Sequence, residues 1–143
     1  PRRGGRKPGQ TMYVCDVALS FLELSLQRKN SGRGVPVGAA LGGTAVATYA
    51  LAPPERVRGL VLVGAVDLER HGPQFKVLTG KPILLIWGKE DDVSPISNAE
   101  AVMSRVSTAE LIRLGRRHAC YLDDPTGFTQ AVTDFLKTRV KAA

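Results

Sequence analysis

Two short runs of consecutive apolar residues constrain the fold of this chain more than any other feature. They are Leu60–Val63 and Ile83–Trp87, which read Leu-Val-Leu-Val and Ile-Leu-Leu-Ile-Trp. Runs of this kind, without polar alternation, are typical of strands in a parallel sheet, because crossover helices bury both faces of such a sheet. We therefore predict a parallel sheet lying between two layers of helices.

The rest of the chain alternates between helical and extended patterns around these runs. Apolar residues recur at helical spacing, or small residues gather between breakers, over residues 11–30, 44–51, 97–106 and 126–140. Weaker strands are predicted at residues 35–37 and 110–114. The last helix is expected to bury one face formed by Phe128, Val132, Phe135 and Leu136. This alternation predicts a three-layer α/β/α sandwich with a mostly parallel sheet.

The composition is that of an ordinary globular domain, with 43% hydrophobic and 23% charged residues among 143. No apolar run approaches the roughly 20 residues that span a bilayer, so we predict no membrane span. Cys15 and Cys120 lie far apart and have neither metal-ligand nor redox spacing. We expect separate buried thiols in preference to a disulfide, which favours a reducing compartment.

Basic residues dominate the first ten positions, and the whole chain carries a net charge of +7. Arg2, Arg3, Arg6 and Lys7 lie in a Pro/Gly-rich stretch without acidic residues. We expect residues 1–10 to form a basic loop that precedes a single domain over residues 11–143. Such a loop could contact RNA or another anionic surface through phosphate charge alone, or it could be an ordinary solvated surface. The chain has no nucleic-acid-binding motif to decide between them.

A glycine-rich segment, Gly38-Ala39-Ala40-Leu41-Gly42, lies between a predicted strand and a predicted helix. Its spacing is that of the nucleophile elbow G-x-S-x-G, with alanine in place of serine. In such an elbow we expect side chains at both flanking glycines to collide with their neighbours. The Leu41 N–H, at the start of the helix, would face an oxyanion. Taken alone, the spacing also fits a tight turn in any α/β protein.

Two later segments resemble the α/β-hydrolase family. The first, residues 87–95 (Trp-Gly-Lys-Glu-Asp-Asp-Val-Ser-Pro), resembles the family's Gly-x-x-Asp segment after a strand, which implies that Asp91 is the triad acid. The second, residues 115–125, resembles the histidine loop, which implies that His118 is the triad base. The order 40, 91, 118 matches the family's Ser, Asp, His order. Residues 52–63 also resemble a recurring family stretch, so the likeness runs from residue 11 to the end.

The resemblance implies the C-terminal portion of an α/β-hydrolase fold, with no metal or organic cofactor. In a working relative, the residue at position 40 would be the nucleophile, His118 the general base and then acid, and Asp91 the group that orients the imidazole. Asp92 is the alternative acid if the register shifts by one residue. Cys120 is less suited to replace the nucleophile than to be a buried thiol. The stretch from residue 64 to 81 is too short for a helical cap, and residues 118–125 resemble those of small capless hydrolases.

Three departures from the family pattern affect function. Ala40 has no hydroxyl, so no acyl-enzyme can form there. The chain begins where the fourth strand of the fold would end, so we expect an open apolar edge at residues 35–37. A partner protein chain would cover this edge. Without such a partner, we expect that the 143-residue chain would not be independently stable. Arg116 and Arg117 replace small residues and would crowd a substrate entrance.

Three functions fit these residues. The first is an inactive hydrolase-like protein that serves as a structural or docking subunit of a larger complex, such as an organellar or RNA-containing one. The second is a serine hydrolase or esterase whose nucleophile was changed to Ala40, and the third is a small-molecule binding module that uses the relic pocket. The basic composition favours an organellar (mitochondrial) interior, and nothing in the sequence excludes the cytosol.

Overall fold

The computed structural model describes residues 34–140. The basic loop at residues 1–10, the helix predicted over residues 11–30 and Cys15 lie outside the described residues. In the described part, no helix is long and apolar enough to cross a membrane.

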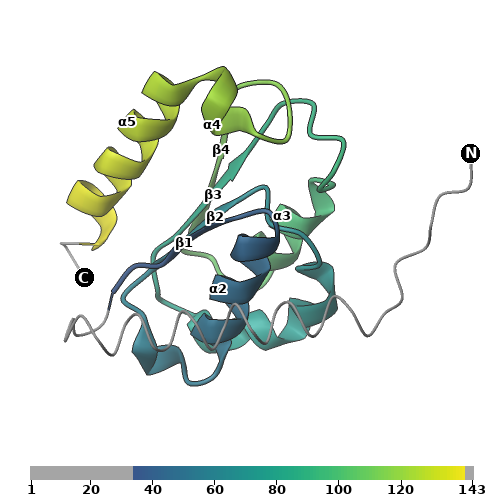
Figure 1. The fold of residues 1–143 in the computed structure, drawn as a ribbon. Coiled ribbons are helices and arrows are strands. Elements are labelled where there is room, and N and C mark those ends of the chain that lie inside the picture. The colour runs from purple at the N-terminus through teal and green to yellow at the C-terminus, as the bar shows by residue number, and fades with distance from the viewer. Residues whose placement is uncertain (1–33, 141–143) are drawn as a thin grey trace, which may run out of the picture.

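Four parallel strands form the sheet at the centre of the described region (Figure 1). Their order in space, β1-β2-β3-β4, follows their order in the chain. They are β1 (Val37–Ala39), β2 (Leu60–Val63), β3 (Ile83–Trp87) and β4 (Ala109–Arg113). The register pairs Val37 with Val61, Val61 with Leu84, and Leu84 with Glu110. Because all strands run the same way, their carboxyl ends share one edge of the sheet.

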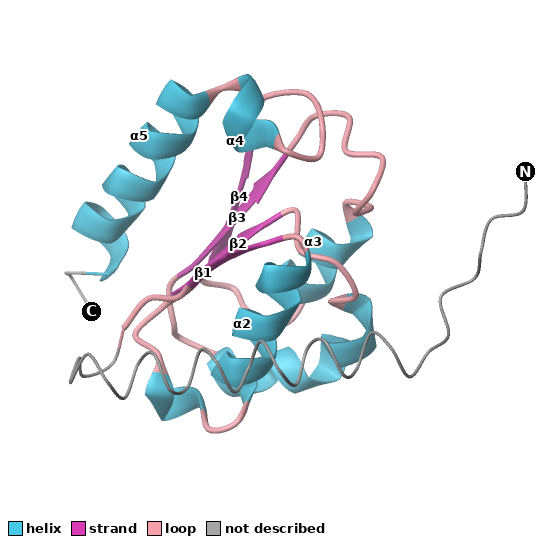
Figure 2. Ribbon diagram, viewed as in Figure 1, coloured by secondary structure: helices cyan, strands magenta, loops and turns pink. Residues whose placement is uncertain are grey.

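Helices cover both faces of this sheet, as Figure 2 shows. On one face lie α2 (Leu41–Leu51) and α3 (Ser97–Met103), and on the other lies α5 (Pro125–Phe135), which continues as a π-helical turn, η3 (Leu136–Val140). Shorter helical segments are η1 (Pro54–Arg56), η2 (Glu69–Leu78) and α4 (Cys120–Asp123). The predicted three-layer α/β/α sandwich is therefore confirmed.

Successive side chains along each strand point to opposite faces of the sheet, so the core is divided into two parts, one on each face. Leu62 and Leu85 pack with the residues of α2 and α3, while Val61 and Leu84 pack against Phe135 of α5. Every residue of β2 and β3 is buried. This is why these strands have apolar side chains at successive positions, since each face of the sheet has its own helical layer.

The two central strands have the bounds that the sequence predicts, whereas the outer elements differ. The first strand was expected at residues 35–37 and occupies Val37–Ala39, because the Pro36 nitrogen has no hydrogen to donate to a ladder. The fourth strand begins one residue early, at Ala109. The helix expected from residue 44 already begins at Leu41, directly after the elbow.

The helices that follow differ from the prediction in smaller ways. The helix predicted over residues 97–106 ends at Met103, and η2 occupies a stretch expected to be loop. On the last helix, Phe135 is buried, and Phe128 and Val132 pack against the core. Leu136 is 36% exposed, so its place on the buried face was predicted wrongly. It lies where α5 passes into the wider π-helical turn, which changes the rotation between successive side chains.

Candidate active site

The residues that the sequence analysis selected lie at the carboxyl edge of the sheet. Ala40 directly follows β1, Asp91 lies in the loop after β3, and His118 lies in the loop after β4. A fourth residue, Gly64, directly follows β2. In open parallel sheets this edge is where ligands bind, because loops from adjacent strands meet there.

His118 and Asp91 are in direct contact. The His118 Nδ1 atom lies 2.8 Å from Asp91 Oδ2 and 3.0 Å from Asp91 Oδ1. The Asp91 side chain is 2% exposed and that of His118 is 24% exposed. Asp91 Oδ1 also accepts hydrogen bonds from the backbone N–H groups of Val93 and Ser94, each at 2.9 Å. Asp92, the alternative acid, is exposed and makes no such contact among the described residues.

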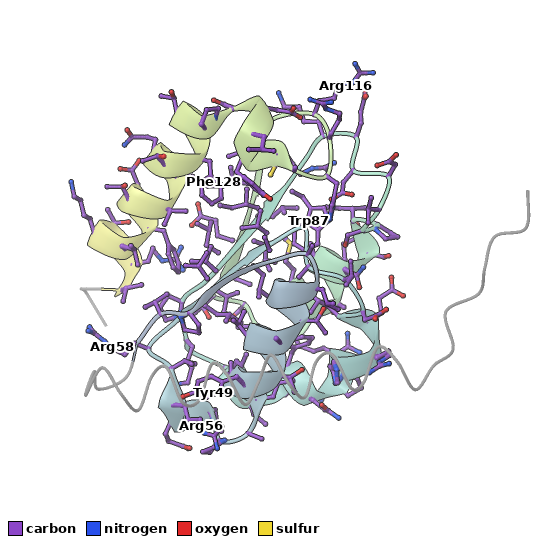
Figure 3. All side chains as sticks on the ribbon, viewed as in Figure 1. Tyr49, Arg56, Arg58, Trp87, Arg116 and Phe128 are labelled. Atoms are coloured by element: carbon purple, nitrogen blue, oxygen red, sulfur yellow. The ribbon has the colours of Figure 1, made fainter. Side chains whose placement is uncertain are left out.

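A buried polar network lies behind Asp91. Ser94 is fully buried, and its hydroxyl donates to the Ala65 carbonyl at 2.7 Å. Asn98 is 5% exposed, and its amide donates to the Ser94 hydroxyl while its carbonyl accepts from the N–H groups of Leu68 and Glu69. The network connects the loop after β3 that carries Asp91, here called the acid loop, to the segment after β2. Trp87, which closes β3 near the centre of Figure 3, donates its indole N–H to the Ser94 carbonyl.

Ala40 has the backbone geometry of a sharp strand-to-helix turn. Its φ is 51° and its ψ is −120°, a region that a residue with a side chain rarely adopts and that costs about 1–3 kcal/mol. The Ala40 N–H donates to the Val63 carbonyl at 2.9 Å, and its carbonyl accepts from Gly43 at 3.1 Å and from Val66 at 3.4 Å. Leu41 is the first residue of α2, a position whose N–H has no partner inside the helix.

The glycines around Ala40 do not all have the role that we expected. A side chain on Gly38 would lie 2.5 Å from the Gly42 carbonyl oxygen, so glycine is required there. A side chain on Gly42 would meet nothing within 4 Å, so the expected collision at this second glycine is wrong. Gly43 is the crowded one instead, since its added carbon would lie 2.5 Å from the Ala65 Cβ. The helix packs on the β2 loop through Gly43, one residue later than the G-x-S-x-G spacing indicates.

Gly64 lies beside Asp91 and His118, and the residue before it contacts Ala40. Its φ is +51°, and an added Cβ would lie 3.1 Å from Asp91 Oδ2 and 3.2 Å from the His118 ring. The preceding residue, Val63, accepts the hydrogen bond from the Ala40 N–H. Ala40, Asp91 and His118 therefore surround one short backbone segment at the end of β2.

The acid and histidine loops enclose a hollow of about 670 Å³. Its lining is formed by residues of those loops and of α4: Glu90, Asp92, Arg116, Arg117, His118, Ala119, Leu122 and Asp123. Neither Ala40 nor Leu41 lines it. Arg116, at the outer edge of the molecule in Figure 3, forms an ion pair with Glu90, and Arg117 pairs with Asp123 at 2.7 Å. Both arginines thus stand at the mouth beside His118, each held by a carboxylate.

Asp123 organises the histidine loop. Its carboxylate accepts the Arg117 guanidinium and the backbone N–H groups of Arg116 and Arg117, at 3.0 Å and 2.8 Å. The Arg117 guanidinium and these N–H groups hold the pKa of the Asp123 carboxyl well below its usual range. Gly88 completes the junction with the acid loop, because a side chain there would overlap the Arg117 carbonyl.

Cys120 is a buried thiol, as the sequence analysis expects. Its side chain is fully buried and free of any disulfide, and burial raises the pKa of the thiol. A buried thiol with a raised pKa holds little thiolate, which is the reactive form. In the described part of the chain, no group of three or more His, Cys, Asp or Glu side chains could hold a metal ion.

Sequence reasoning missed Gly64, Ser94 and Asn98. The position of Gly64, directly after a buried strand at the ligand-binding edge, could have indicated it. Asn98 gave no signal, because its bonds to residues 68 and 69 depend on the fold bringing α3 beside the start of η2.

Known proteins resemble this chain in both sequence and fold. No protein-family model matches it. The putative protein-lysine deacylase ABHD14B of Rattus norvegicus is 25% identical over 118 residues, which cover 82% of this chain and 56% of that protein, and the Homo sapiens protein matches equally. The chain therefore spans a little over half the length of these relatives.

Solved structures show the same fold. A predicted CIB-like hydrolase from Thermoplasma acidophilum has a TM-score of 0.79 and 29% identity, and the match covers 86% of this chain and 59% of that one. A serine-to-alanine mutant of the meta-cleavage product hydrolase CumD from Pseudomonas fluorescens, complexed with acetates, has a TM-score of 0.76 and 17% identity over 96% of this chain and 74% of that one. The chain is thus an α/β-hydrolase-fold protein, and its described residues form the C-terminal portion of that fold.

Proposed function

We propose that this α/β-hydrolase-like protein has lost acyl-enzyme chemistry and serves as a structural or docking subunit of a larger complex. The observation that carries the proposal is the backbone of Ala40, which has a φ of 51° beside the Asp91–His118 pair. In a nucleophile elbow this conformation presents a side chain at the top of the sheet. Here the side chain is a methyl group, which cannot attack a carbonyl carbon.

Among residues 34–140, β1 pairs with β2 alone, and its second edge supports the docking role. Val37 is 50% exposed although it belongs to a strand of the central sheet. Apolar strand edges of this kind pair with other chains when they are left open. We infer that a partner protein chain adds a strand along β1, which would cover the Val37 side chain.

The loss of acyl-enzyme chemistry is tested by Ala40→Ser in the full-length protein. We expect the unaltered protein to show no labelling of residue 40 by a fluorophosphonate probe, and the variant to gain it. The serine hydroxyl would then lie beside the base that His118 supplies. The double variant Ala40→Ser/His118→Gln is the control and should lose the gained labelling. A variant that stays unlabelled although it is folded would contradict the assignment of position 40.

The docking role is tested by the mass of the native assembly and by a matched pair of substitutions. Native mass spectrometry of protein purified from its source should give a mass larger than that of the chain alone. Val37→Lys should then release the partner, whereas Val77→Lys should not, because Val77 is 49% exposed but lies on η2, away from β1. A protein that always travels alone would refute the docking role.

A second candidate function, binding of a small molecule without turnover, is favoured by the hollow beside His118. A cavity of about 670 Å³ falls within the range that ligand sites occupy. The CumD serine-to-alanine mutant is complexed with acetates, so a small carboxylate is the ligand to try first. A shift of the His118 NMR signals on addition of acetate, without a shift at His71, would support this candidate.

A further inference from the structure

Basic side chains gather at the amino edge of the sheet, where the strands begin. We use this name for the segments that lead into β2, β3 and β4, which are residues 57–59, 79–82 and 107–108. Arg58 lies in the first segment, Lys81 lies in the second, and Lys76 lies in the last turn of η2 just before it. Figure 3 shows Arg58 on the opposite side of the molecule from Arg116, which lines the hollow. The cations of the amino edge are therefore remote from the candidate active site.

Backbone carbonyl groups hold two of these cations in place. Lys81 Nζ donates to the Val57 carbonyl at 2.9 Å, and the Arg58 guanidinium donates to the Val140 carbonyl at 3.4 Å. A carbonyl group is neutral, so each side chain is oriented without losing its charge. A guanidinium has five N–H donors and an ammonium has three, which leaves most of them available for an anion.

The three cations of the amino edge differ from the arginines that have carboxylate partners. Arg116 and Arg117 at the hollow are both paired in this way. Arg139 donates to the Thr108 carbonyl at the amino edge, but Glu110 takes up its charge at 3.0 Å. Within residues 34–140, no carboxylate forms an ion pair with any of the three. Positive charge at the amino edge is therefore left to attract an anion.

The amino edge lacks the apolar and aromatic groups that other partners need. Its segments contain no aromatic residue, and none of the exposed large apolar side chains of residues 34–140 belongs to them. Protein interfaces are centred on apolar or aromatic anchors, so an acidic protein segment fits poorly. Single-stranded nucleic acids need aromatic rings for their bases. Tyr49, on the neighbouring α2, is 8% exposed and has the Arg56 guanidinium 4.9 Å from its ring centroid (Figure 3), so it offers no free face.

The turn before β3 leaves the two lysines open to close approach. The Lys81 N–H donates to the Leu78 carbonyl at 3.0 Å and closes a turn in which Gly80 has a φ of +83°. A side chain at Gly80 would meet nothing within 4 Å, and Thr79 is a small exposed residue. Neither residue shields Lys76 or Lys81 from a bulky anion.

We propose that the amino edge binds the phosphate backbone of a nucleic-acid duplex through Arg58, Lys76 and Lys81, without reading its sequence. The bases of a duplex are already stacked, so they need no aromatic side chains. Guanidinium and ammonium groups donate to phosphate oxygens, and each contact releases a counterion from the duplex. The net charge of +7 adds long-range attraction. The inference uses neither position 40 nor the second edge of β1, so it goes beyond the proposed function and does not depend on it.

The test measures binding of a fluorescein-labelled RNA duplex to the full-length protein by fluorescence anisotropy, between about 50 and 200 mM KCl. Arg58→Gln/Lys81→Gln removes two of the three cations. Because each phosphate contact contributes about 0.9 to the slope of log K against log salt, we expect this slope to become shallower by about 2. At the lowest salt concentration we expect the affinity to fall at least about tenfold.

The matched control is Lys89→Gln/Arg113→Gln, which removes the same charge from the carboxyl edge. Arg113 resembles Arg58 in that carbonyl groups hold it, those of Gly88 and Lys89 at 3.1 Å and 3.0 Å. The control should keep the slope of the unaltered protein. Equal changes in both double variants would overturn the inference, because binding would then follow total charge and not the amino edge.

Two further measurements separate charge from folding and from other anions. The charge-conserving variant Arg58→Lys/Lys81→Arg should bind the duplex as the unaltered protein does. A loss equal to that of the glutamine variant would refute the inference, since packing and not charge would then be responsible. A DNA duplex of the same length should bind comparably, because the contacts go to phosphate groups. Polyglutamate should bind more weakly, and tighter binding of polyglutamate would assign the surface to an acidic protein and overturn the inference.

Discussion

The two halves of the candidate site are maintained by different means. The acid–histidine half is held by side-chain hydrogen bonds, from Asp91 through Ser94 to Asn98. The elbow half is held by backbone conformation and by close contacts at glycine, with no polar side chain at position 40. At position 40 the elbow half carries a methyl group on a backbone with a positive φ. We propose that this architecture would position a hydroxyl group if serine stood there.

The largest expected effect concerns the elbow half, through Gly38→Ala. The added carbon would lie 2.5 Å from the Gly42 carbonyl oxygen and 2.6 Å from Val46 Cγ2, and the backbone atoms have little room to move. We expect the free energy of unfolding in urea to fall by about 3 kcal/mol.

Gly42→Ala provides the matched control for this prediction. A side chain there meets nothing within 4 Å, and the residue lies in α2. Because alanine favours a helix over glycine, this variant should be as stable as the unaltered protein or up to about 1 kcal/mol more stable. Equal losses at both glycines would show that the elbow is not held by contact at Gly38.

The next effect concerns the acid–histidine half, through Asn98→Leu. Leucine has a similar size but leaves the Leu68 N–H without its acceptor in a buried position. We expect a loss of about 2 kcal/mol in thermal or urea unfolding. Gln74→Leu is the control, since its contact with His71 lies at the surface and should contribute little. A loss no larger than that of the control would mean that the network does not hold this half together.

How far the sequence predicts the molecule differs between the same two halves. Asp91 and His118 were selected from their loop contexts, and the structure brings them together. The central strands were also predicted with their bounds, because burial on both faces leaves a clear apolar run. The first strand was misplaced, since Gly38 and Ala39 have no apolar pattern to indicate their burial.

Contacts that depend on packing between distant elements were not predictable. Gly43 differs from Gly42 only in that it faces Ala65, and the sequence does not encode that difference locally. Asn98 likewise acts through residues 68 and 69, which lie on another element. The sequence pattern therefore indicated which residues meet at the candidate site, but not which residues hold them in position.

A smaller effect tests the strain at the elbow, through Ala40→Gly. Glycine adopts a φ of 51° freely, whereas alanine does so at a cost, so the variant should relieve strain in the folded state. Glycine loses more entropy on folding than alanine, which offsets part of this effect. We therefore expect the free energy of unfolding to rise by about 1 kcal/mol. Ala47→Gly inside α2, where the side chain is fully buried, should instead destabilise. If both variants lose stability equally, the elbow carries no strain.

The smallest effect concerns pH and the ion pair at the mouth of the hollow. Arg117 and two backbone N–H groups lower the pKa of Asp123 in the folded protein, whereas in the unfolded chain it has its ordinary pKa of about 3.9. The folded state therefore binds the proton less readily, so this contribution to stability is fully present above that ordinary pKa and is lost as the pH falls below it. Asp123→Asn should be less stable than the unaltered protein at pH 7, and the difference should shrink at acidic pH.

Urea unfolding of both proteins between neutral and acidic pH measures this difference. Because Arg117 is exposed, added salt should reduce the difference at neutral pH. Glu110→Gln, which removes the partner of Arg139 near the amino end of β4, supplies the reference for an ordinary surface pair. A larger and more pH-dependent loss for Asp123→Asn than for Glu110→Gln would show that the histidine loop depends on this carboxylate. Equal profiles would mean that the loop that carries His118 does not depend on the charge of the Asp123 carboxylate.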